Sequence, residues 1–299
     1  MQIFVFILLS IIWGTTWLAI KVTIEGIPPF MGAAMRFIVA VIFLFLYARF
    51  KGTTLKLTKS DFKPLFISAI LLYSFDYGLI YWGEQYLSAG VTAIFFATYP
   101  LFVSIFANFV FKNELFNRYK FAGVVIGFSG VLIIFYEQLF KTNFNFLVML
   151  AVIAIIISAI SAALSTIIVK KHLHHVNAVP LSLHQMVWGV LSLLAMSILS
   201  GEVDDITISL KVMTAVLYLG LFGSALAFVM FYWLLKKVSA ITISFIIYIT
   251  PVVALIADWL FFGERIAVRT VIGMLLIFSG IAISQRNRSV TKKIPPVLD

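Results

Sequence analysis

The chain alternates long apolar stretches with short connections that hold most of its charged residues. A helix needs roughly 20 residues to cross a hydrocarbon core of ~30 Å, and ten stretches approach or exceed that length. They cover approximately residues 3–22, 30–49, 64–84, 89–111, 119–137, 145–169, 182–200, 212–235, 239–262 and 266–285. The pattern predicts an all-α polytopic membrane protein with ten transmembrane helices and no soluble domain between them.

The composition agrees with this class of protein. Hydrophobic residues make up 63% of the 299 positions and charged residues only 11%, whereas a soluble domain carries about 25% charged residues. Cysteine is absent, so neither a disulfide framework nor thiolate chemistry is expected. The apolar N-terminus lacks a basic region and a cleavage motif, so we expect it to remain as the first span.

The placement of positive charge predicts the orientation. With a cytoplasmic N-terminus, sixteen lysines and arginines fall on the cytoplasmic side, five fall on the other side, and Arg36 lies inside a span. The sixteen are Arg49, Lys51, Lys56, Lys59, Lys63, Lys112, Arg118, Lys120, Lys170, Lys171, Lys236, Lys237, Arg286, Arg288, Lys292 and Lys293. This bias follows the positive-inside rule and predicts two cytoplasmic termini. The net charge of +10 therefore indicates topology rather than a nucleic-acid partner.

Short phrases recur at a spacing of about 150 positions. The matched pairs are Pro100 with Pro251, Glu114 with Glu264, Gly123 with Gly273, and FSG at 128–130 with FSG at 278–280. We interpret them as an old duplication of five helices. Because five is odd, the second copy enters the membrane from the opposite side. We therefore expect two inverted repeats, 1–143 and 144–288, and a cytoplasmic tail at 289–299.

Four further motifs occur along the chain: WGTTWLAIK at 13–21, PPFMGAAMRF at 28–37, FKNE at 111–114 and FFGE at 261–264. With the FSG of the fifth span, they resemble the drug/metabolite transporter superfamily, and most closely its EamA-type ten-helix branch. The resemblance covers essentially the whole chain and implies a secondary transporter in a bacterial cytoplasmic membrane. It leaves the substrate open, because this branch exports amino acids and many other small metabolites. The sixth span departs from the pattern, since ISAISAALSTIIVKK at 157–171 lacks the aromatic–glycine or aromatic–alanine pair often found there.

Two ionisable residues lie well inside the predicted spans. A charge in the bilayer costs at least ~2.5–3.5 kcal/mol and needs a partner or a function. Arg36 and Asp76 lie at depths that differ by only about 3 Å, so an ion pair between them is geometrically feasible. Two interpretations stay open: a permanent salt bridge between the second and third spans, or a carboxylate at Asp76 that responds to a proton or to substrate.

Aromatic and hydroxyl side chains are the candidate substrate contacts. Each lies on a stripe at helical spacing or beside an intramembrane proline. The predicted substrate-binding residues are Trp17, Tyr73, Asp76, Tyr77, Tyr99, Ser161 and Tyr248. For Ser161 and its serine stripe, close helix packing is an equal alternative. Pro100 and Pro251 each remove a backbone hydrogen bond, and paired interruptions of this kind predict kinks that shape and gate a transport cavity.

The predicted function is secondary transport of a small amino-acid-like or amphipathic solute by alternating access, with export as the expected direction. A facilitative uniporter or a gated pore is the alternative, and an intramembrane enzyme has no supporting HExxH or GxSxG motif. No cofactor or metal site is expected, because no P-loop occurs and the histidines of the 172–175 loop lack nearby carboxylates in the sequence. The expected partners are a small-molecule substrate and the lipid bilayer, with proton coupling left open. The chain is expected to act as a monomer or a homodimer.

Overall fold

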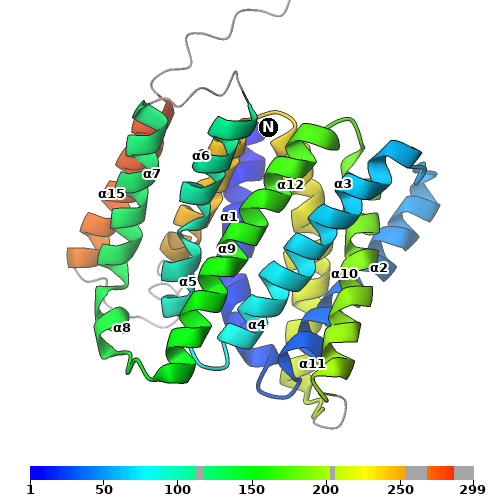
Figure 1. Ribbon diagram of the computed structural model, residues 1–299, viewed down its shortest axis with the longest axis horizontal. Helices are drawn as coiled ribbons and strands as arrows, with labels where there is room; N and C mark the ends of the chain where they lie inside the picture. The colour runs from blue at the N-terminus through cyan, green and yellow to red at the C-terminus, as the bar shows by residue number, and fades with distance from the viewer. Residues whose placement is uncertain (112–117, 203–205, 254–267, 286–299) are drawn as a thin grey trace, which may run out of the picture.

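The computed structural model describes residues 1–111, 118–202, 206–253 and 268–285, and its described residues contain helices but no strands (Figure 1). In chain order the helices are α1 (Gln2–Thr23), α2 (Pro29–Lys51), α3 (Lys59–Ala69), η1 (Ile70–Gly78), α4 (Leu79–Gly83), α5 (Ala89–Phe96), α6 (Tyr99–Val110), α7 (Arg118–Ile134), α8 (Tyr136–Lys141), α9 (Phe146–His172), α10 (Ala178–Leu199), α11 (Leu210–Tyr218), η2 (Leu219–Leu226), α12 (Ala227–Leu235), α13 (Ala240–Ser244) and α15 (Val268–Gln285). The matched pair Glu114 and Glu264 and the tail at 289–299 lie outside the described residues.

Seven helical stretches of the described chain are long and apolar enough to cross a membrane. They are Gln2–Thr23, Pro29–Lys51, Lys59–Gly83, Ala89–Val110, Phe146–His172, Ala178–Leu199 and Leu210–Leu235. Shorter apolar helices, Ala240–Val253 and Val268–Ser284, fall in the predicted ninth and tenth spans, and α7 falls in the fifth. The prediction of an all-α polytopic membrane protein is therefore confirmed. The count of ten spans stays a prediction.

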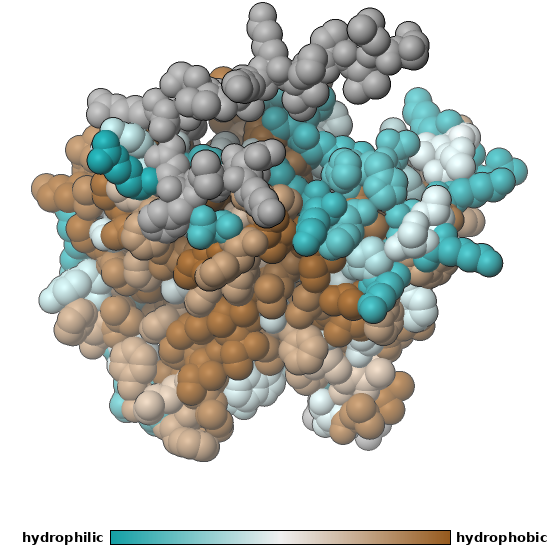
Figure 2. Space-filling view, turned by 45° about the horizontal axis from the view of Figure 1, so that its top comes forward, coloured by the Kyte–Doolittle hydropathy of each residue, from teal (hydrophilic) through white to brown (hydrophobic). Residues whose placement is uncertain are grey.

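The surface has the polarity expected of a bilayer-embedded bundle. Figure 2 shows a broad apolar area along the side of the molecule, with hydrophilic side chains gathered toward one end. Phe45, Leu191 and Leu275 are among the large apolar side chains exposed on the helices. By contrast, Lys56 in the connection between α2 and α3 and Lys59 at the start of α3 are both exposed. An exposed apolar area of this extent would be unfavourable in water. In a bilayer it is the surface that faces the lipid tails.

Two long helices change to wider π-helical turns near their middle. The segments η1 and η2 begin at positions 70 and 219, which are 149 positions apart, and each is continued by a regular helix. In a π-helix each backbone bond spans five residues instead of four, and such turns are frequent at functional sites. One of them, η1, carries Asp76 and Tyr77.

Pro100 and Pro251 each follow an interruption of their helix. α5 ends at Phe96, four residues before Pro100. In a continuous helix the ring of Pro100 would clash with the carbonyl of Phe96. A turn likewise separates α13 from the helical residues that carry Pro251. The carbonyl of Ile247, freed by Pro251, accepts the hydroxyl of Thr250 at 3.0 Å. Both helices are thus broken near the cavity described below, and a role of the prolines in gating stays a prediction.

Helices α7 and α15 pack side by side at one edge of the bundle (Figure 1). Gly123 faces Gly280, and Gly130 faces Gly273. A Cβ atom added to any of the four would lie less than 3.0 Å from the carbonyl oxygen of the opposite glycine. These small residues let the two backbones touch, which is how helices associate without a hydrophobic driving force in lipid. Gly123 and Gly273 are 150 positions apart, and so are Gly130 and Gly280. Each of the two contacts therefore corresponds to the other at this spacing.

Candidate functional site

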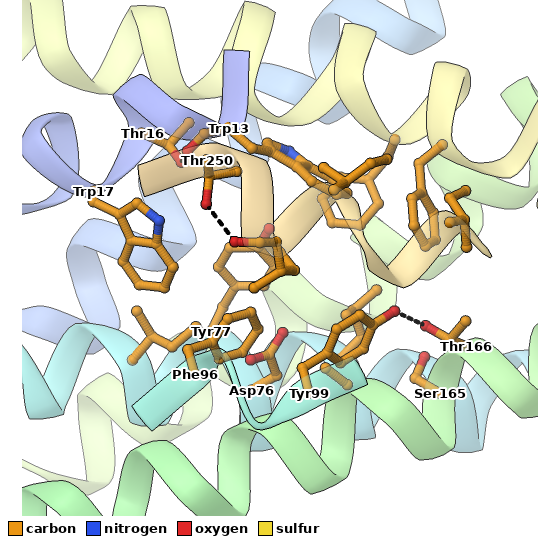
Figure 3. Close-up of a pocket in the computed structure, with 18 of the residues that line it drawn as sticks. Trp13, Thr16, Trp17, Asp76, Tyr77, Phe96, Tyr99, Ser165, Thr166 and Thr250 are labelled. Atoms are coloured by element: carbon orange, nitrogen blue, oxygen red, sulfur yellow. Dashed lines mark hydrogen bonds between the residues drawn. The ribbon is translucent and has the colours of Figure 1, made fainter. Parts of the chain in front are cut away.

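A cavity of about 70 Å³ lies between helices of both halves (Figure 3). Its lining consists of Trp13, Thr16, Trp17, Ile20, Leu72, Asp76, Tyr77, Ile80, Phe96, Tyr99, Ala162, Ser165, Thr166, Phe228, Phe231, Tyr232, Ile243, Ile246, Ile247 and Thr250. Most of these side chains are apolar or aromatic, with a few hydroxyls and one carboxylate among them. This composition is typical of small-molecule binding sites.

The lining residues of the two halves correspond in a regular way. Trp13, Thr16 and Trp17 on α1 match Ala162, Ser165 and Thr166 on α9, each 149 positions later. Tyr77, Ile80, Phe96 and Tyr99 match Phe228, Phe231, Ile247 and Thr250, each 151 positions later. Matching positions therefore face one shared space. Their chemistry differs, because α1 supplies indole rings where α9 supplies a methyl group and hydroxyls.

Aromatic rings form one wall of the cavity. The Trp17 ring meets the Phe96 ring edge-on, with centroids 5.5 Å apart. Phe96 in turn stacks on Tyr99 at 5.9 Å and an interplanar angle of 3°. The Tyr99 hydroxyl is hydrogen-bonded to the Thr166 hydroxyl at 2.9 Å, as Figure 3 shows. The hydroxyl of Tyr99 therefore has a partner in the other half of the chain, and the ring of Tyr99 remains in the cavity wall.

A buried polar network supports the cavity wall contributed by α12. The Tyr232 hydroxyl donates to Oε1 of Gln185, and Nε2 of Gln185 donates to the Ser68 hydroxyl at 2.6 Å. The Ser165 hydroxyl donates to the Ser68 carbonyl at 2.8 Å. Gln185, Ser68 and Ser165 are almost completely buried. The network joins four helices, α3, α9, α10 and α12, behind one side of the cavity.

Replacing Gln185 with leucine should destabilise the protein, because the Tyr232 hydroxyl and the Ser68 hydroxyl would each lose a partner. A buried polar group left without a partner costs about 1–3 kcal/mol. We expect a lower apparent melting temperature for the detergent-purified variant. Adding Tyr232→Phe to Gln185→Leu should recover part of the loss, since it removes one orphaned group. A single variant as stable as the wild type would contradict this account.

Asp76 is the carboxylate of the cavity. Its side chain is 3% exposed and points into the cavity beside Tyr77 (Figure 3). Its Oδ1 atom is buried and has no hydrogen-bond partner in the protein. No other lining residue in the described part of the chain has an acidic or basic side chain. A carboxylate with an unpartnered oxygen among aromatic rings favours a cationic or hydrogen-donating ligand group.

The predicted ion pair between Arg36 and Asp76 is not formed in this structure. Both side chains are described, yet no nitrogen of Arg36 lies within 4.0 Å of the carboxylate of Asp76. Instead, Nε of Arg36 donates to the Ser224 hydroxyl on η2 at 3.0 Å. The guanidinium lies 4.9 Å from the ring centroid of Tyr77 and 5.0 Å from that of Phe37. These contacts hold Arg36 behind Tyr77, where it supports the cavity wall and acts on the carboxylate without direct contact.

The structure places four of the seven predicted contacts in the lining: Trp17, Asp76, Tyr77 and Tyr99. Tyr248 faces α7 instead. Its ring packs on Gly127 and its hydroxyl donates to the Val124 carbonyl at 3.0 Å. Its place next to the cavity is taken by Thr250, which directly precedes the proline as Tyr99 does in the first half.

Tyr73 and Ser161 are buried behind the lining. The Tyr73 ring packs on Gly189 and meets Phe37 edge-on at 4.6 Å. Ser161 is buried on α9, one residue from the lining position Ala162. Ala162 and the aromatic residues of α12, Phe228, Phe231 and Tyr232, line the cavity but were not predicted from the sequence. The sequence contains one signal for the lining residues of α9. When Lys21 at the end of WGTTWLAIK is aligned with Lys170 at the end of AALSTIIVK, the lining residues of α1 align with those of α9.

Together, the helical bundle and its internal cavity define a multi-pass α-helical membrane protein with a largely apolar cavity between its helices. The model of the EamA-like transporter family matches two segments of the chain, residues 1–136 and 149–285. The chain belongs to the EamA-like transporter family and is a membrane transporter.

Relatives along the whole chain agree with this assignment. The uncharacterized transporter YoaV of Bacillus subtilis is 28% identical, over 91% of this chain and 92% of its own length. Protein PagO of Salmonella typhimurium is also 28% identical, over 96% of this chain and 94% of its own. The uncharacterized inner membrane transporter YedA of Escherichia coli K12 is 29% identical, over 87% and 82%. One protein of known crystal structure superposes with a TM-score of 0.80 at 15% identity, covering 95% of this chain and 96% of the other, which shows the shared fold.

Proposed function

We propose that this transporter moves a small amphipathic solute that carries a cationic amine, such as an amino-acid-like compound, through the cavity at Asp76. The observation that carries the proposal is the buried carboxylate with an unpartnered oxygen, surrounded by aromatic walls. A protonated amine would supply the missing donor and charge, while the rings of Trp17 and Phe96 would contact the apolar part of the solute. Transport, rather than catalysis, is the role proposed for the site.

The proposed mechanism is alternating access by two inverted repeats. Three observations support it: the family model matches the chain twice, the glycine contacts between α7 and α15 are reciprocal, and cavity residues correspond between the halves. Halves of opposite orientation can exchange conformations and expose one site to either side in turn. The cavity of about 70 Å³ is small, so a solute enters only when the surrounding helices move apart.

The proposed setting is the bacterial inner membrane with both termini in the cytoplasm, and the proposed direction is export. The excess of lysine and arginine on the loops of the N-terminal face supports this orientation. We treat the functional unit as a monomer or a homodimer, since each chain contains a complete cavity.

Counterflow in proteoliposomes tests the proposal directly. Vesicles loaded with an unlabelled solute should accumulate the same labelled solute transiently, because a carrier exchanges solutes across the membrane. The solutes tested are individual amino acids and other small metabolites, and we expect counterflow for a member with a cationic amine and an apolar side chain. Saturable uptake should accompany it. Flux that neither saturates nor shows counterflow would instead indicate a pore, and activity confined to anionic solutes would contradict the assignment of Asp76.

A further inference from the structure

Arg36 is a buried cation that uses little of its hydrogen-bonding capacity. The residue is 1% exposed, and its Nε atom donates to the Ser224 hydroxyl at 3.0 Å. The terminal nitrogens Nη1 and Nη2 are buried and have no hydrogen-bond partner of ordinary geometry in the described part of the chain. The Tyr81 hydroxyl is a neighbour of the guanidinium. Unused donors of a buried charge cost free energy, so these nitrogens need either a ligand or a structural reason.

The corresponding place in the second half of the chain holds a neutral residue. Arg36 corresponds to Gln185, 149 positions later, and Tyr81 corresponds to Tyr232, 151 positions later. These offsets are the ones that relate the cavity residues of the two halves. The Tyr232 hydroxyl donates to Oε1 of Gln185, whose Nε2 donates to the Ser68 hydroxyl at 2.6 Å. An amide thus finds partners for its oxygen and its nitrogen at this place, so the packing of these helices does not require a cation.

The guanidinium lies directly behind the cavity wall. Its central carbon is 4.9 Å from the ring centroid of Tyr77, a lining residue that stands beside Asp76 (Figure 3). On another side, a Cβ atom added to Gly223 would lie 3.1 Å from Nη2 of Arg36 and 2.9 Å from Cγ2 of Thr16. Thr16 also lines the cavity. A change in the orientation of the Tyr77 ring would therefore open a path from the terminal nitrogens to the cavity.

Arg36 and Asp76 bring opposite charges to one cavity. They do not touch, yet the guanidinium acts on the carboxylate across the space between them. The same field repels a cation that binds to Asp76. A solute whose own carboxylate faces the guanidinium escapes this repulsion and supplies acceptors for Nη1 and Nη2. The planar fork of a guanidinium also matches the two oxygens of a carboxylate. The two charges are therefore complementary to a zwitterion rather than to an amine alone.

We propose that Arg36 is a concealed carboxylate-binding residue that makes the transporter select zwitterionic solutes over amines. This inference rests on the proposed function, in which Asp76 binds the amine of the solute. When the cavity walls move apart, the Tyr77 ring turns aside and the terminal nitrogens of Arg36 face the solute. The Ser224 hydroxyl keeps its contact with Nε and orients the guanidinium. A solute that carries the amine without a carboxylate leaves these nitrogens unpaired and binds more weakly.

A matched series of solutes tests the proposal on the unmodified protein. The solutes are leucine, methionine and phenylalanine, each compared with its amide, which keeps the amine and lacks the carboxylate. Counterflow is measured in proteoliposomes at about pH 6.5, below the pKa of about 7.7–8.0 of an α-amino group. We expect the initial rate at limiting concentration to be roughly tenfold or more higher for a free amino acid than for its amide, because a charge-assisted contact is lost. The N-acetyl derivatives, which lack the amine, test Asp76 in the same way.

Variants at position 36 assign the selectivity to this side chain. Arg36→Gln introduces the amide that the second half carries at the corresponding place, and should bring the ratio of the two rates to within about twofold of one. Arg36→Lys should keep an intermediate ratio, because an ammonium group retains the charge but not the planar fork. Arg49→Gln, on the exposed end of the same helix α2, is the matched control and should keep the wild-type ratio. A ratio taken within one protein does not depend on the amount of folded protein.

The outcomes separate this proposal from the proposed function. A wild-type protein that exchanges amides as fast as free amino acids would overturn the role of Arg36 and leave the amine site at Asp76 intact. An Arg36→Gln variant with the wild-type ratio would also overturn it. If no amine-bearing solute shows counterflow, the proposed function is wrong and this inference is wrong with it.

Discussion

Asp76→Asn is expected to reduce counterflow of an amine-bearing solute by about 100-fold. The amide keeps the size of the side chain but removes the charge that would pair with the amine. Losing a buried charge-assisted contact costs about 3 kcal/mol, which corresponds to about 100-fold in affinity. Initial counterflow rates, measured over a range of solute concentrations at equal protein content, check the effect.

Two comparisons make this test specific to the cavity. Glu137→Gln alters an exposed carboxylate on α8, which lies outside the cavity, and should leave counterflow within twofold of wild type. Asp76→Asn should not lower the melting temperature, because no protein group pairs with the unpartnered oxygen. A variant that transports normally would show that the carboxylate does not bind solute. A strongly destabilised variant would instead indicate a structural role for Asp76.

Gly280→Ala should lower the apparent melting temperature by about 5–10 °C. The added methyl group would lie less than 3.0 Å from the carbonyl oxygen of Gly123 and the backbone nitrogen of Gly127. Backbone atoms cannot rotate away, so α7 and α15 would have to separate along their contact. Overpacking of this kind costs about 1–3 kcal/mol, and about 2–4 °C accompanies each kcal/mol in proteins of moderate size.

Ser279→Ala is the matched control, because Ser279 precedes Gly280 on α15 but is exposed on its outer face. A surface substitution there should change stability by less than about 0.5 kcal/mol. Thermal unfolding of both variants in the same detergent gives the comparison. Equal melting temperatures for Gly280→Ala and Ser279→Ala would show that close contact between these helices does not limit stability.

Helical spacing singled out several residues that the structure places in the lining of the cavity. Asp76 stands out in the sequence because a charge inside a span needs a partner or a function, and the structure places this residue in the lining. The stripe on α1 and the proline neighbour Tyr99 also reach the cavity. The same reasoning failed to place Tyr248, because a residue near a proline has no preferred face. The ring of Tyr248 instead packs against Gly127 on α7, a residue far away in the sequence.

The partner of Arg36 shows why depth alone was insufficient. The estimated depths of Arg36 and Asp76 agree, but depth does not define the direction in which a long side chain extends. The hydroxyl of Ser224 and the rings beside it come from other parts of the chain and bind the guanidinium first. Lys21 is a second example, since its acceptors are the backbone carbonyls of Glu84 and Leu87, and a backbone carbonyl is the same in every residue type.

By itself, the sequence determined the membrane class and the approximate helix ranges, because the lengths and polarity of apolar runs are set by the bilayer. It also contained the recurring phrases from which the two halves are predicted. Only the tertiary structure decided which face of each helix meets the cavity, which groups hold Arg36, and which carbonyls bind Lys21. The physical reason is that a helix in lipid is apolar on both its inner and outer faces. Its composition therefore gives little indication of direction, and the packing of distant segments decides the contacts.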